Sequence, residues 1–498
     1  MIKLIQNELI KIFKRKSIYF ILFLSMIAII VHNNLNPDQN ENLAIINSTE
    51  NIPTTGIEKT LEQKSGEEYI SQKANLEIIK LYNSYPKDSW QRFALKEERT
   101  SKNINGVEID FNKDIEKILK NIDAFELNLD TEVTKEDYEK SKVKYNEYVE
   151  MLNADNWKDF VNLKIKNLNE IKNSKNITET EKDGINFEIE VYEMRLKNNI
   201  NFSNNIQNQY IDEYKSNYYA IQFYNNYDES KAFKNKSLNT YKEKMNLCKY
   251  AIENNLNIDI SNENGIILNN KIDARISFIR TFRHFDLIIV IIAIYLSTTI
   301  VTEEINKKTI KNLLTKPHKR STIIMSKVIA CTITILISML FVITVQYIVG
   351  GIIFGFDSYE MNYIGYNFNN DQIIIMNLFQ YVIMVGLSKL PMYIMIIAFC
   401  LLIGTLNNNT SMSMTLTLII FLIGYKILPE WSKVETLSII TRYFVTNNWD
   451  FSVYLFGQVS DISGVTIYSS IIIYFIHLFM LLYLVIYKFN RKEIYNNV

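Results

Sequence analysis

The charges that could do specific work in this sequence gather in one stretch, Glu303–Lys327, which reads EEINKKTIKNLLTKPHKRSTIIMSK between two long apolar runs. Glu303 and Glu304 open the stretch. The basic residues that follow them are Lys307, Lys308, Lys311, Lys316, Lys319, Arg320 and Lys327. Charges in this pattern can set the topology of a membrane protein, bind anionic lipids or dock on a cytoplasmic partner. The residue types alone leave these three interpretations open.

The sequence carries none of the common patterns for catalysis or metal binding. It has no G-x-x-x-x-G-K-[ST] loop for phosphate, and only 14 of its 498 residues are glycine. The four His residues are scattered, and Cys248, Cys331 and Cys400 lie far apart, which argues against a metal site or a disulfide framework. Basic and acidic residues balance at 54 each, so charge gives no argument for a nucleic-acid partner. We therefore expect a chain that is not an enzyme and binds no cofactor itself.

The charged stretch is predicted to contain a short amphipathic helix. The residues on one helical face are Ile305, Thr309, Asn312, Leu313 and Lys316. Ile310 and Leu314 lie beside this face, and Pro317 ends the helix. Such a helix, held between two membrane helices, is a lever that a partner could push.

Long apolar runs predict an all-α polytopic membrane protein with six membrane helices, because about 20 apolar residues cross the roughly 30 Å hydrocarbon core. The predicted spans are residues 17–32, 284–302, 323–355, part of 372–406, 412–428 and 466–487. The first run could instead belong to a secretory signal. No small-x-small cleavage site follows it, which favours a retained anchor.

The run 372–406 is too long for one straight crossing, and Lys389 and Pro391 divide it. We interpret residues 372–387 as a helix that lies at the interface or re-enters the membrane, and residues 389–406 as the fourth span. A lysine in apolar surroundings is costly unless it reaches water or a partner. Lys389 is therefore expected to mark an interfacial break between two helices, with a substrate site as the alternative.

Basic residues decide the orientation of the chain. They concentrate in residues 1–16, 303–322 and 488–498, and six spans bring these three segments to the same side, the cytoplasm. Two full crossings within 372–406 would send the basic tail outside, so six spans are preferred over seven. The excess of Asn, Ile, Lys and Tyr is associated with AT-rich bacterial genomes. We therefore expect a bacterial plasma membrane protein with both termini cytoplasmic, and with residues 356–371 and 429–465 outside.

Residues 33–283, between the first two spans, are expected to form a large extracellular domain. Their apolar residues recur at three- and four-residue spacing among charges, which predicts mostly helices. A small strand element is expected near NINGVEIDF, residues 103–111. Tyr and Trp at helical spacing are expected to be core residues. Residues 264–290 keep a helical pattern, so one continuous helix should join this domain to the second span.

The stretch 302–330, TEEINKKTIKNLLTKPHKRSTIIMSKVIA, resembles the signature of ABC-2 type transporter permeases. That signature has an acidic residue after the second span, a gT-x-k-x-LL-x-x-P helix, a basic residue, and an sK pair that opens the third span. The matching residues are Glu303 or Glu304, Thr309, Lys311, Leu313, Leu314, Pro317, Arg320, Ser326 and Lys327. Lys308 departs from the pattern, since Gly is common at its position.

Other parts of the sequence resemble the same family. The opening MIKLIQNELIKIFKRKSIYFILF is similar to its amino-terminal interfacial helix. One face of that helix would hold Ile2, Ile5, Leu9, Ile12 and Phe13. FCLLIGTLNNNTSMSMTLTLIIFLIG is similar to its turn between the fourth and fifth spans, and YKFNRKEI to its closing motif. The resemblance covers residues 1–31 and 285–498 and leaves out the extracellular domain, which is much larger than the usual connection.

The resemblance implies that residues 303–322 form a coupling helix on a separate ATP-hydrolysing subunit. ATP and Mg would then belong to that partner. It further implies two ABC ATPase subunits, a second permease chain that is either a copy or a paralogue, and surrounding membrane lipids. Leu428–Phe451 would form short re-entrant exit helices near the outer mouth; an ordinary structured outer loop is the alternative. The residues assigned to this exit region are Trp431, Arg442, Tyr443, Phe444 and Trp449.

The function that the resemblance implies is outward transport driven by ATP. A peptide antibiotic, a bacteriocin or an amphipathic lipid-like molecule is the expected cargo, although no residue identifies it. The alternative is an ATPase-coupled mechanotransmission or sensor protein that acts through its extracellular domain in antimicrobial peptide resistance and moves no cargo. A membrane-anchored binding protein without an ATPase is a third hypothesis.

Overall fold

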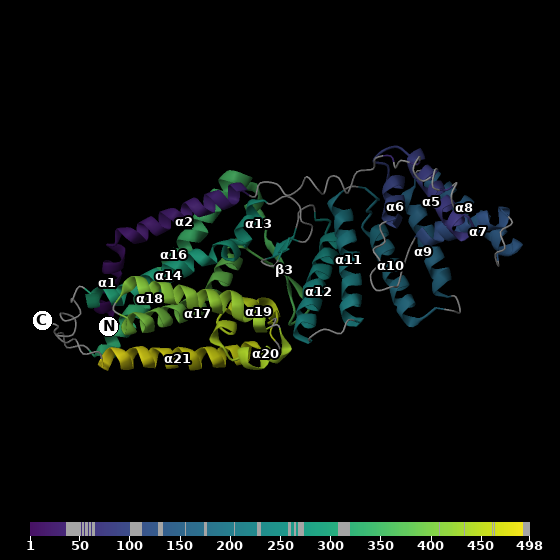
Figure 1. Ribbon diagram of the computed structural model, residues 1–498. Helices are drawn as coiled ribbons and strands as arrows, with labels where there is room; N and C mark the ends of the chain where they lie inside the picture. Colours follow the sequence, from purple (N-terminus) through teal and green to yellow (C-terminus); the bar gives the residue numbers. More distant parts are fainter. Residues whose placement is uncertain are drawn as a thin grey trace. The chain divides into compact units, whose positions relative to one another are not determined.

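The computed structural model describes two compact units (Figure 1). Unit 1 comprises Met1–Gln39, Tyr227–Glu243 and Ile260–Val498, and unit 2 comprises Asn40–Asn226 and Lys244–Asp259. The structure describes all of the chain except residues 36–50, 52–53, 55–57, 59–60, 62–64, 100–111, 128–132, 155, 174–176, 204, 227–230, 257–259, 263–264, 267–272, 307–318, 408, 433, 461, 463 and 492–498.

Within the described residues, unit 1 has six helical segments long and apolar enough to cross a membrane. They are α2 (Lys16–Leu35), α13 with α14 (Ala274–Ile279 and Thr281–Asn306), α16 (Arg320–Phe354), α17 (Leu378–Leu406), α18 with its continuation (Thr410–Ser432) and α21 (Ile467–Arg491). A helix pairs its backbone polar groups internally, so it can cross a medium without water. The predicted all-α polytopic fold with six spans is confirmed.

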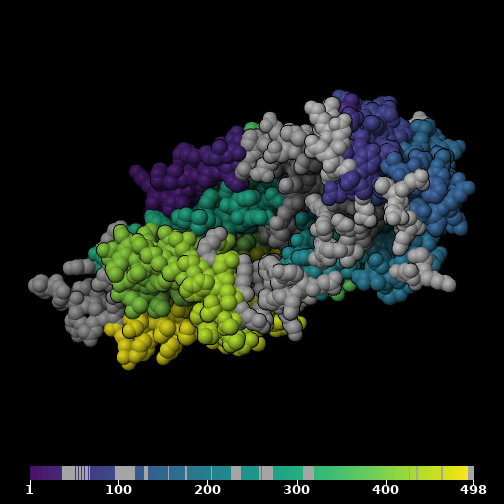
Figure 2. Space-filling view, turned by 45° about the vertical axis from the view of Figure 1, so that its right-hand side comes forward, coloured from purple at the N-terminus to yellow at the C-terminus, as the bar shows by residue number. Residues whose placement is uncertain are grey.

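α14 and α17 form the centre of unit 1 and pack closely along each other, whereas α2 and α21 lie at its surface. In its most apolar window, 78% of α13–α14 is buried, against 22% in both α2 and α21. Figure 2 shows α2 as a purple ridge on the surface of this unit. An apolar helix with so little protein contact leaves most of its side chains to face lipid.

α17 differs from the sequence prediction. Residues 372–387 do not form a separate helix: β4 (Gln372–Met376) pairs antiparallel with β3 (Tyr363–Asn367), and Asn377 then caps a single helix that runs to Leu406. Pro391 lies inside this helix without dividing it. Neighbouring helices in a membrane bundle can accommodate a proline that would break an isolated helix. The predicted break at Lys389 and Pro391 is therefore wrong.

The connection into the second span also differs from the prediction of one continuous helix over 264–290. β2 (Gly265–Ile266) pairs with β1 (Ser261–Asn262) in a short antiparallel hairpin. α13 begins only at Ala274, where the Asp273 carboxylate accepts a hydrogen bond from the Ile276 amide at 2.6 Å. Arg280 separates α13 from α14. An N-cap of this kind marks a helix start, which the apolar periodicity did not reveal.

Short helices connect the fifth and sixth spans. α18 (Thr410–Leu422) passes through a π-helical turn at Ile423–Ile427 into α19 (Leu428–Ser432). α20 (Glu435–Thr441) follows, and then the 3-10 turns η3 (Val445–Asn447) and η4 (Phe451–Gly457) lead to α21. Short helices are therefore present in this region, while their re-entry into the membrane stays a prediction.

The described part of unit 2 consists of helices, as the sequence predicted. They are α5 (Glu67–Ser84), α6 (Trp90–Arg99), α7 (Asn112–Glu126), α8 (Lys135–Asn153), α9 (Trp157–Lys172), α10 (Glu179–Lys197) and α11 (Ile206–Asn226), while α12 (Lys231–Glu253) falls partly in each unit. Capping boxes start two of them: Thr134 with Asp137 at α8, and Thr178 with Glu181 at α10. The strand expected near residues 103–111 lies outside the described residues.

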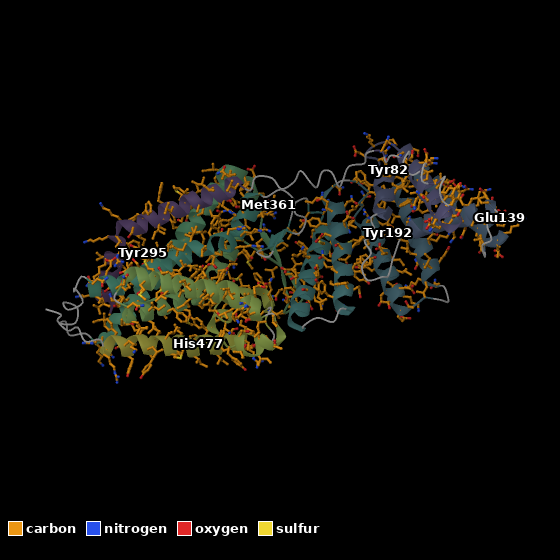
Figure 3. The ribbon with its side chains drawn as sticks, in the orientation of Figure 1. Tyr82, Glu139, Tyr192, Tyr295, Met361 and His477 are labelled. Atoms are coloured by element: carbon orange, nitrogen blue, oxygen red, sulfur yellow. The ribbon has the colours of Figure 1, made fainter. Side chains whose placement is uncertain are left out.

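Aromatic side chains form much of the core of unit 2. Tyr82 and Tyr192 are 2% and 3% exposed and lie within the helices (Figure 3). Tyr148 meets Phe160 edge to face at 5.3 Å, and the Lys164 ammonium lies 4.5 Å from the centre of the Tyr148 ring. Edge-to-face and cation–π contacts are typical of packed aromatic cores. The prediction that these tyrosines are core residues is confirmed.

Candidate functional site: a charged cluster beside residues 307–318

The structure places part of the predicted coupling segment. Thr309, Lys311, Leu313, Leu314 and Pro317 lie outside the described residues. Glu303 and Glu304 lie in the last turn of α14, while Arg320 and Lys327 lie in the first turns of α16. These described residues therefore belong to the two helices that enter and leave the 307–318 segment.

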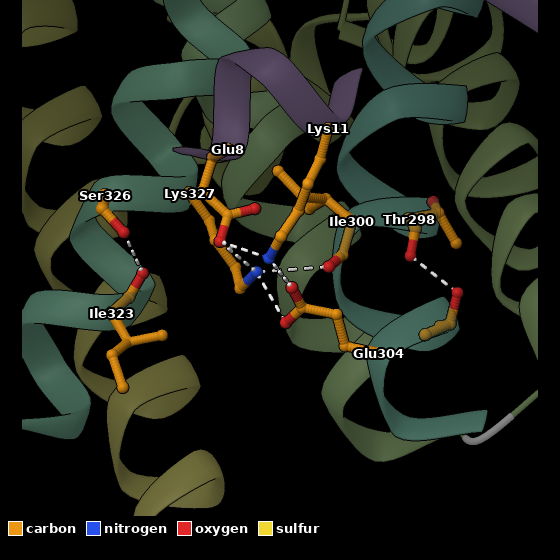
Figure 4. A network of polar contacts seen from close by, with 9 residues as sticks. Glu8, Lys11, Thr298, Ile300, Glu304, Ile323, Ser326 and Lys327 are labelled. Atoms are coloured by element: carbon orange, nitrogen blue, oxygen red, sulfur yellow. Dashed lines mark hydrogen bonds and ion pairs between the residues drawn. The ribbon is translucent and has the colours of Figure 1, made fainter. Parts of the chain in front are cut away.

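Glu304 and Lys327 meet in a cluster that also includes two residues of the amino-terminal helix α1 (Ile2–Phe13), as Figure 4 shows. The Lys327 ammonium lies 2.7 Å from Glu304 Oε2 and 3.1 Å from Glu8 Oε1. The Lys11 ammonium donates to Glu304 Oε1 at 2.6 Å and lies 3.3 Å from Glu8 Oε1. Two carboxylates and two ammonium groups thus join α1, α14 and α16.

Most of this cluster is withdrawn from solvent. The side chains of Lys327, Glu8 and Glu304 are 1%, 2% and 10% exposed, and Lys327 also donates to the Ile300 carbonyl oxygen at 3.3 Å. Buried charges are tolerated when they are paired and hydrogen-bonded, and removing one partner leaves the other uncompensated. The four charges sum to zero. The cluster therefore fastens three helices together at a point where losing a buried charge is costly.

Lys11 is the solvent-facing member, with its side chain 42% exposed. Burial alone would lower the pKa of Lys11, but the hydrogen bond and charge of Glu304, together with Glu8, raise the pKa above its usual value. A raised lysine pKa contributes stability that is present below the unfolded value and is lost only as the pH rises through the folded value. Lys11 therefore stays charged, and the cluster intact, through neutral pH.

The face of α1 that is buried in the protein includes Glu8 and shares only Ile12 with the apolar face predicted for an interfacial helix. Ile2 is 73% exposed, and the buried residues are Leu4, Glu8 and Ile12, spaced four apart. This stripe packs against α16. Glu8 was not identified as a site residue from the sequence, because only the basic residues of this segment entered the argument. The spacing of Leu4, Glu8 and Ile12 was the available signal, because residues four apart lie on the same face of a helix.

The other two described charges of the predicted segment, Glu303 and Arg320, make separate contacts outside the cluster. Arg15, just before α2, lies 3.6 Å from Glu303 and also donates to the Thr299 hydroxyl, so the start of α2 is attached to α14. Arg320 instead donates to the carbonyl oxygens of Phe489 and Asn490, at 3.1 and 2.7 Å. The structure thus brings Glu304 and Lys327 together, while Glu303 pairs with Arg15 and Arg320 joins α16 to the end of α21.

Lys389 belongs to a second buried cluster, which the sequence did not identify. Its side chain is 8% exposed, and its ammonium lies 2.9 Å from Asp450 Oδ2 and 3.6 Å from Asp286 Oδ2. Tyr393, one turn further along α17, donates its hydroxyl hydrogen to Asp286. The lysine is therefore paired inside the protein, and the interfacial break expected at Lys389 is wrong.

The predicted exit region divides into exposed and buried residues. Trp431, Tyr443 and Phe444 are 54%, 55% and 40% exposed. Trp449 is buried and stacks on Phe421 of α18 at 6.2 Å. Arg442 is half-buried, and its guanidinium lies 4.9 Å from the centre of the Tyr443 ring. The five residues therefore do not form one aromatic surface, because Trp449 is part of the core.

Comparison with protein families matches almost the whole chain to one family. A family model described as ABC-2 family transporter protein matches residues 5–494. Neither curated proteins nor solved structures match the chain. The matched range takes in most of α1, all six apolar segments and the clusters around Glu304 and Lys389.

Proposed function

The chain belongs to the ABC-2 transporter family, and on this premise we propose that it is an export permease in which the Glu8–Lys11–Glu304–Lys327 cluster couples ATP hydrolysis to movement of the membrane helices. Membership supports a permease subunit of an ABC transporter that pairs with ABC ATPase subunits. Hydrolysis then belongs to the partner, which holds ATP and Mg, while this chain is not an enzyme and binds no cofactor.

The position of the cluster is the observation that carries this proposal. Glu304 is two residues before the end of α14 and Lys327 is in the second turn of α16, so both helices that flank residues 307–318 are bonded to each other and to α1. A displacement of the 307–318 segment by a partner would act on α14 and α16 together. Paired charges in a low-dielectric site resist separation, so the three helices would move as a unit.

The proposed assembly contains two ATPase subunits and a second permease chain, either a copy or a paralogue. Exposed apolar side chains on α18 support a lateral protein neighbour as well as lipid: they include Met412, Leu416, Leu418, Ile419 and Ile420. The proposed site is the bacterial plasma membrane with both termini cytoplasmic, supported by the basic residues at both ends and in residues 303–322. Unit 2 then faces outward.

The proposed cargo is a peptide antibiotic, a bacteriocin or an amphipathic lipid-like molecule, and its movement is outward. The helices of unit 1 are apolar with few buried charges, which is compatible with an amphipathic cargo. The size of unit 2 favours a second candidate function. A folded outer domain inserted between α2 and α14 is suited to sensing a ligand and transmitting its binding, so the chain could act in antimicrobial peptide resistance without moving cargo.

Copurification tests the coupling proposal. The full chain is expressed with its genomic neighbours and purified, and ATP hydrolysis in the complex is measured. We expect an ATPase subunit to copurify and to be lost in Leu313→Asp, because a charge on the apolar face of the predicted coupling helix should prevent docking. Leu127→Asp, at a 42% exposed leucine of unit 2, is the matched control and should retain the ATPase.

An ATPase that stays bound to Leu313→Asp would contradict the coupling role of this segment. A chain that purifies alone under all detergent and salt conditions would contradict the permease proposal and favour a membrane-anchored binding protein. The choice between export and sensing needs a second measurement on the intact complex. ATP-dependent uptake of a labelled peptide into inverted vesicles supports export, while ligand-dependent ATP hydrolysis without uptake supports sensing.

A further inference from the structure

α14 carries a charged residue of both buried clusters. Glu304 belongs to the cluster with Glu8, Lys11 and Lys327, and Asp286 belongs to the cluster with Lys389 and Asp450. The two acids are 18 positions apart (304 minus 286), which corresponds to about 27 Å along a helix. The 26 residues of α14 include no Gly or Pro, the usual causes of a kink. One stiff helix therefore joins the two clusters.

The Lys389 cluster connects that helix to the short helices between α18 and α21. Asp450 precedes η4 and accepts hydrogen bonds from the Ser452 amide at 3.0 Å and the Ser452 hydroxyl at 2.6 Å. Its other oxygen accepts the 2.9 Å bond from Lys389. The ion pair thus attaches the start of η4 to the middle of α17, the helix that packs against α14.

Two acids lie beside one lysine in this cluster. The Lys389 ammonium is 2.9 Å from Asp450 and 3.6 Å from Asp286, a difference of 0.7 Å. The lysine is closer to Asp450 than to Asp286, and the Coulomb attraction to each acid is larger in a low-dielectric site than in water and grows as the distance shortens. A small shift of α14 towards Lys389 would therefore reverse which acid holds the ammonium.

We propose that Lys389 is a positioning residue for transport, which holds the short helices in place through Asp450 and releases them when a shift of α14 transfers its ammonium to Asp286. This proposal rests on the proposed function, in which a partner moves α14 through the Glu304 cluster. It adds the route by which that movement reaches the segment between the fifth and sixth spans. No bond is made or broken other than the ion pair, so the device is reversible in each transport cycle.

The reactivity of an engineered cysteine measures the release. Val445 of η3 is 5% exposed, and Val445→Cys changes its volume little. The rate of its modification by a water-soluble maleimide is measured in the detergent-solubilised full chain, relative to the chain unfolded in SDS. Cys248, Cys331 and Cys400 are buried. Their own modification is measured in the same variants without Val445→Cys and is subtracted. Modification of a buried thiol reports how often the segment opens.

The two acids should have opposite effects, which a purely structural ion pair would not produce. Asp450→Asn and Lys389→Met break the ion pair between α17 and η4. Each should raise the rate of modification at position 445 about tenfold or more, because the loss of a buried charged partner commonly costs enough free energy to change an opening equilibrium by that factor. Asp286→Asn removes the competing acid and leaves the Lys389–Asp450 pair, so the rate should stay the same or fall. A similar increase for Asp286→Asn and Asp450→Asn would overturn the proposal, as would no increase for Lys389→Met.

A matched control separates release from general loosening of the bundle. Gln346 of α16 accepts from Asn33 at 3.0 Å and donates to the Ser277 hydroxyl at 2.7 Å, and all three are buried. Gln346→Met removes a buried polar side chain away from η3 and η4, so it should change the rate less than about twofold. A rise equal to that of Lys389→Met would mean that any core defect exposes position 445, and the proposal would fail.

The role of α14 is tested by combining variants of the two clusters. Glu304→Gln frees the end of α14 and should raise the rate at position 445, and Asp286→Asn should abolish that rise. An equal rise in both backgrounds, or none in either, would refute transmission through α14. These measurements need no ATPase, so they stand or fall independently of whether an ATPase copurifies with the chain.

Discussion

The two buried clusters of unit 1 share a helix and differ in their charge balance. Around Glu304, two lysines face two glutamates at contacts of 2.6 to 3.3 Å. Around Lys389, one lysine faces two aspartates at unequal distances. In the first cluster each charge lies beside an opposite charge. The second cluster has one more acid than it has lysines.

This difference assigns different mechanical roles to the two clusters. A balanced and buried set of charges has one favourable arrangement, so it holds α1, α14 and α16 in fixed register. Around Lys389 the ammonium lies nearer Asp450 than Asp286, and the proposal above gives this set a second arrangement with the ammonium on Asp286. In the proposed function, the Glu304 cluster is the rigid connection at which the partner acts, and the Lys389 cluster is the connection that releases.

The largest effect is expected for Lys327→Met. The substitution leaves Glu8 and Glu304 buried with only the half-exposed Lys11 as a partner, so it should lower the unfolding free energy by about 3–5 kcal/mol. The measurement is reversible unfolding of the full chain in detergent–SDS mixtures. Lys319→Met, at an exposed lysine before α16, is the control and should have little effect.

A smaller loss is expected for Glu8→Gln, measured in the same way. Lys327 keeps Glu304 as a partner, so the cost should be about 1–3 kcal/mol, which reflects one lost ionic contact at a buried position. A cost near zero would mean that Glu8 only fills space on the buried face of α1. The Glu304 cluster would then not be balanced in the sense argued above.

Lys11→Met should cost less again, about 0.5–1 kcal/mol, because the Lys11 side chain is 42% exposed and solvent screens its contacts. The ratio of the Lys327 and Lys11 effects therefore measures how strongly burial amplifies the same type of ion pair. Equal losses for the two lysines would show that the cluster is hydrated throughout.

The smallest effect is expected for Asp286→Asn, within about 0.5 kcal/mol of the native chain, because the excess acid is removed and Lys389 keeps Asp450. The asparagine carbonyl oxygen can still accept the hydrogen bond from Tyr393. A loss as large as that of Glu8→Gln would break the comparison between the clusters, since both would then depend on every charge they contain.

Features that depend on neighbouring residues in the chain were predictable. The six spans follow from apolar length, and the mostly helical character of unit 2 follows from local periodicity. The amino-terminal helix and the short helices after α18 were expected from the family resemblance. Two predictions of helix boundaries were wrong. Pro391 does not break α17, because the packed bundle supports the helix, and Asp273 starts α13 later than the apolar pattern suggested.

The sequence by itself determined the membrane architecture, the family resemblance and the acids and bases around residues 303–327, because these depend on composition and short spacing. Only the tertiary structure decided which charges pair. Glu8 and Lys327 are 319 positions apart, and Lys389 and Asp450 are 61 apart. The physical reason is that a charge needs a partner only once folding withdraws it from water, and packing alone decides which side chains are withdrawn together.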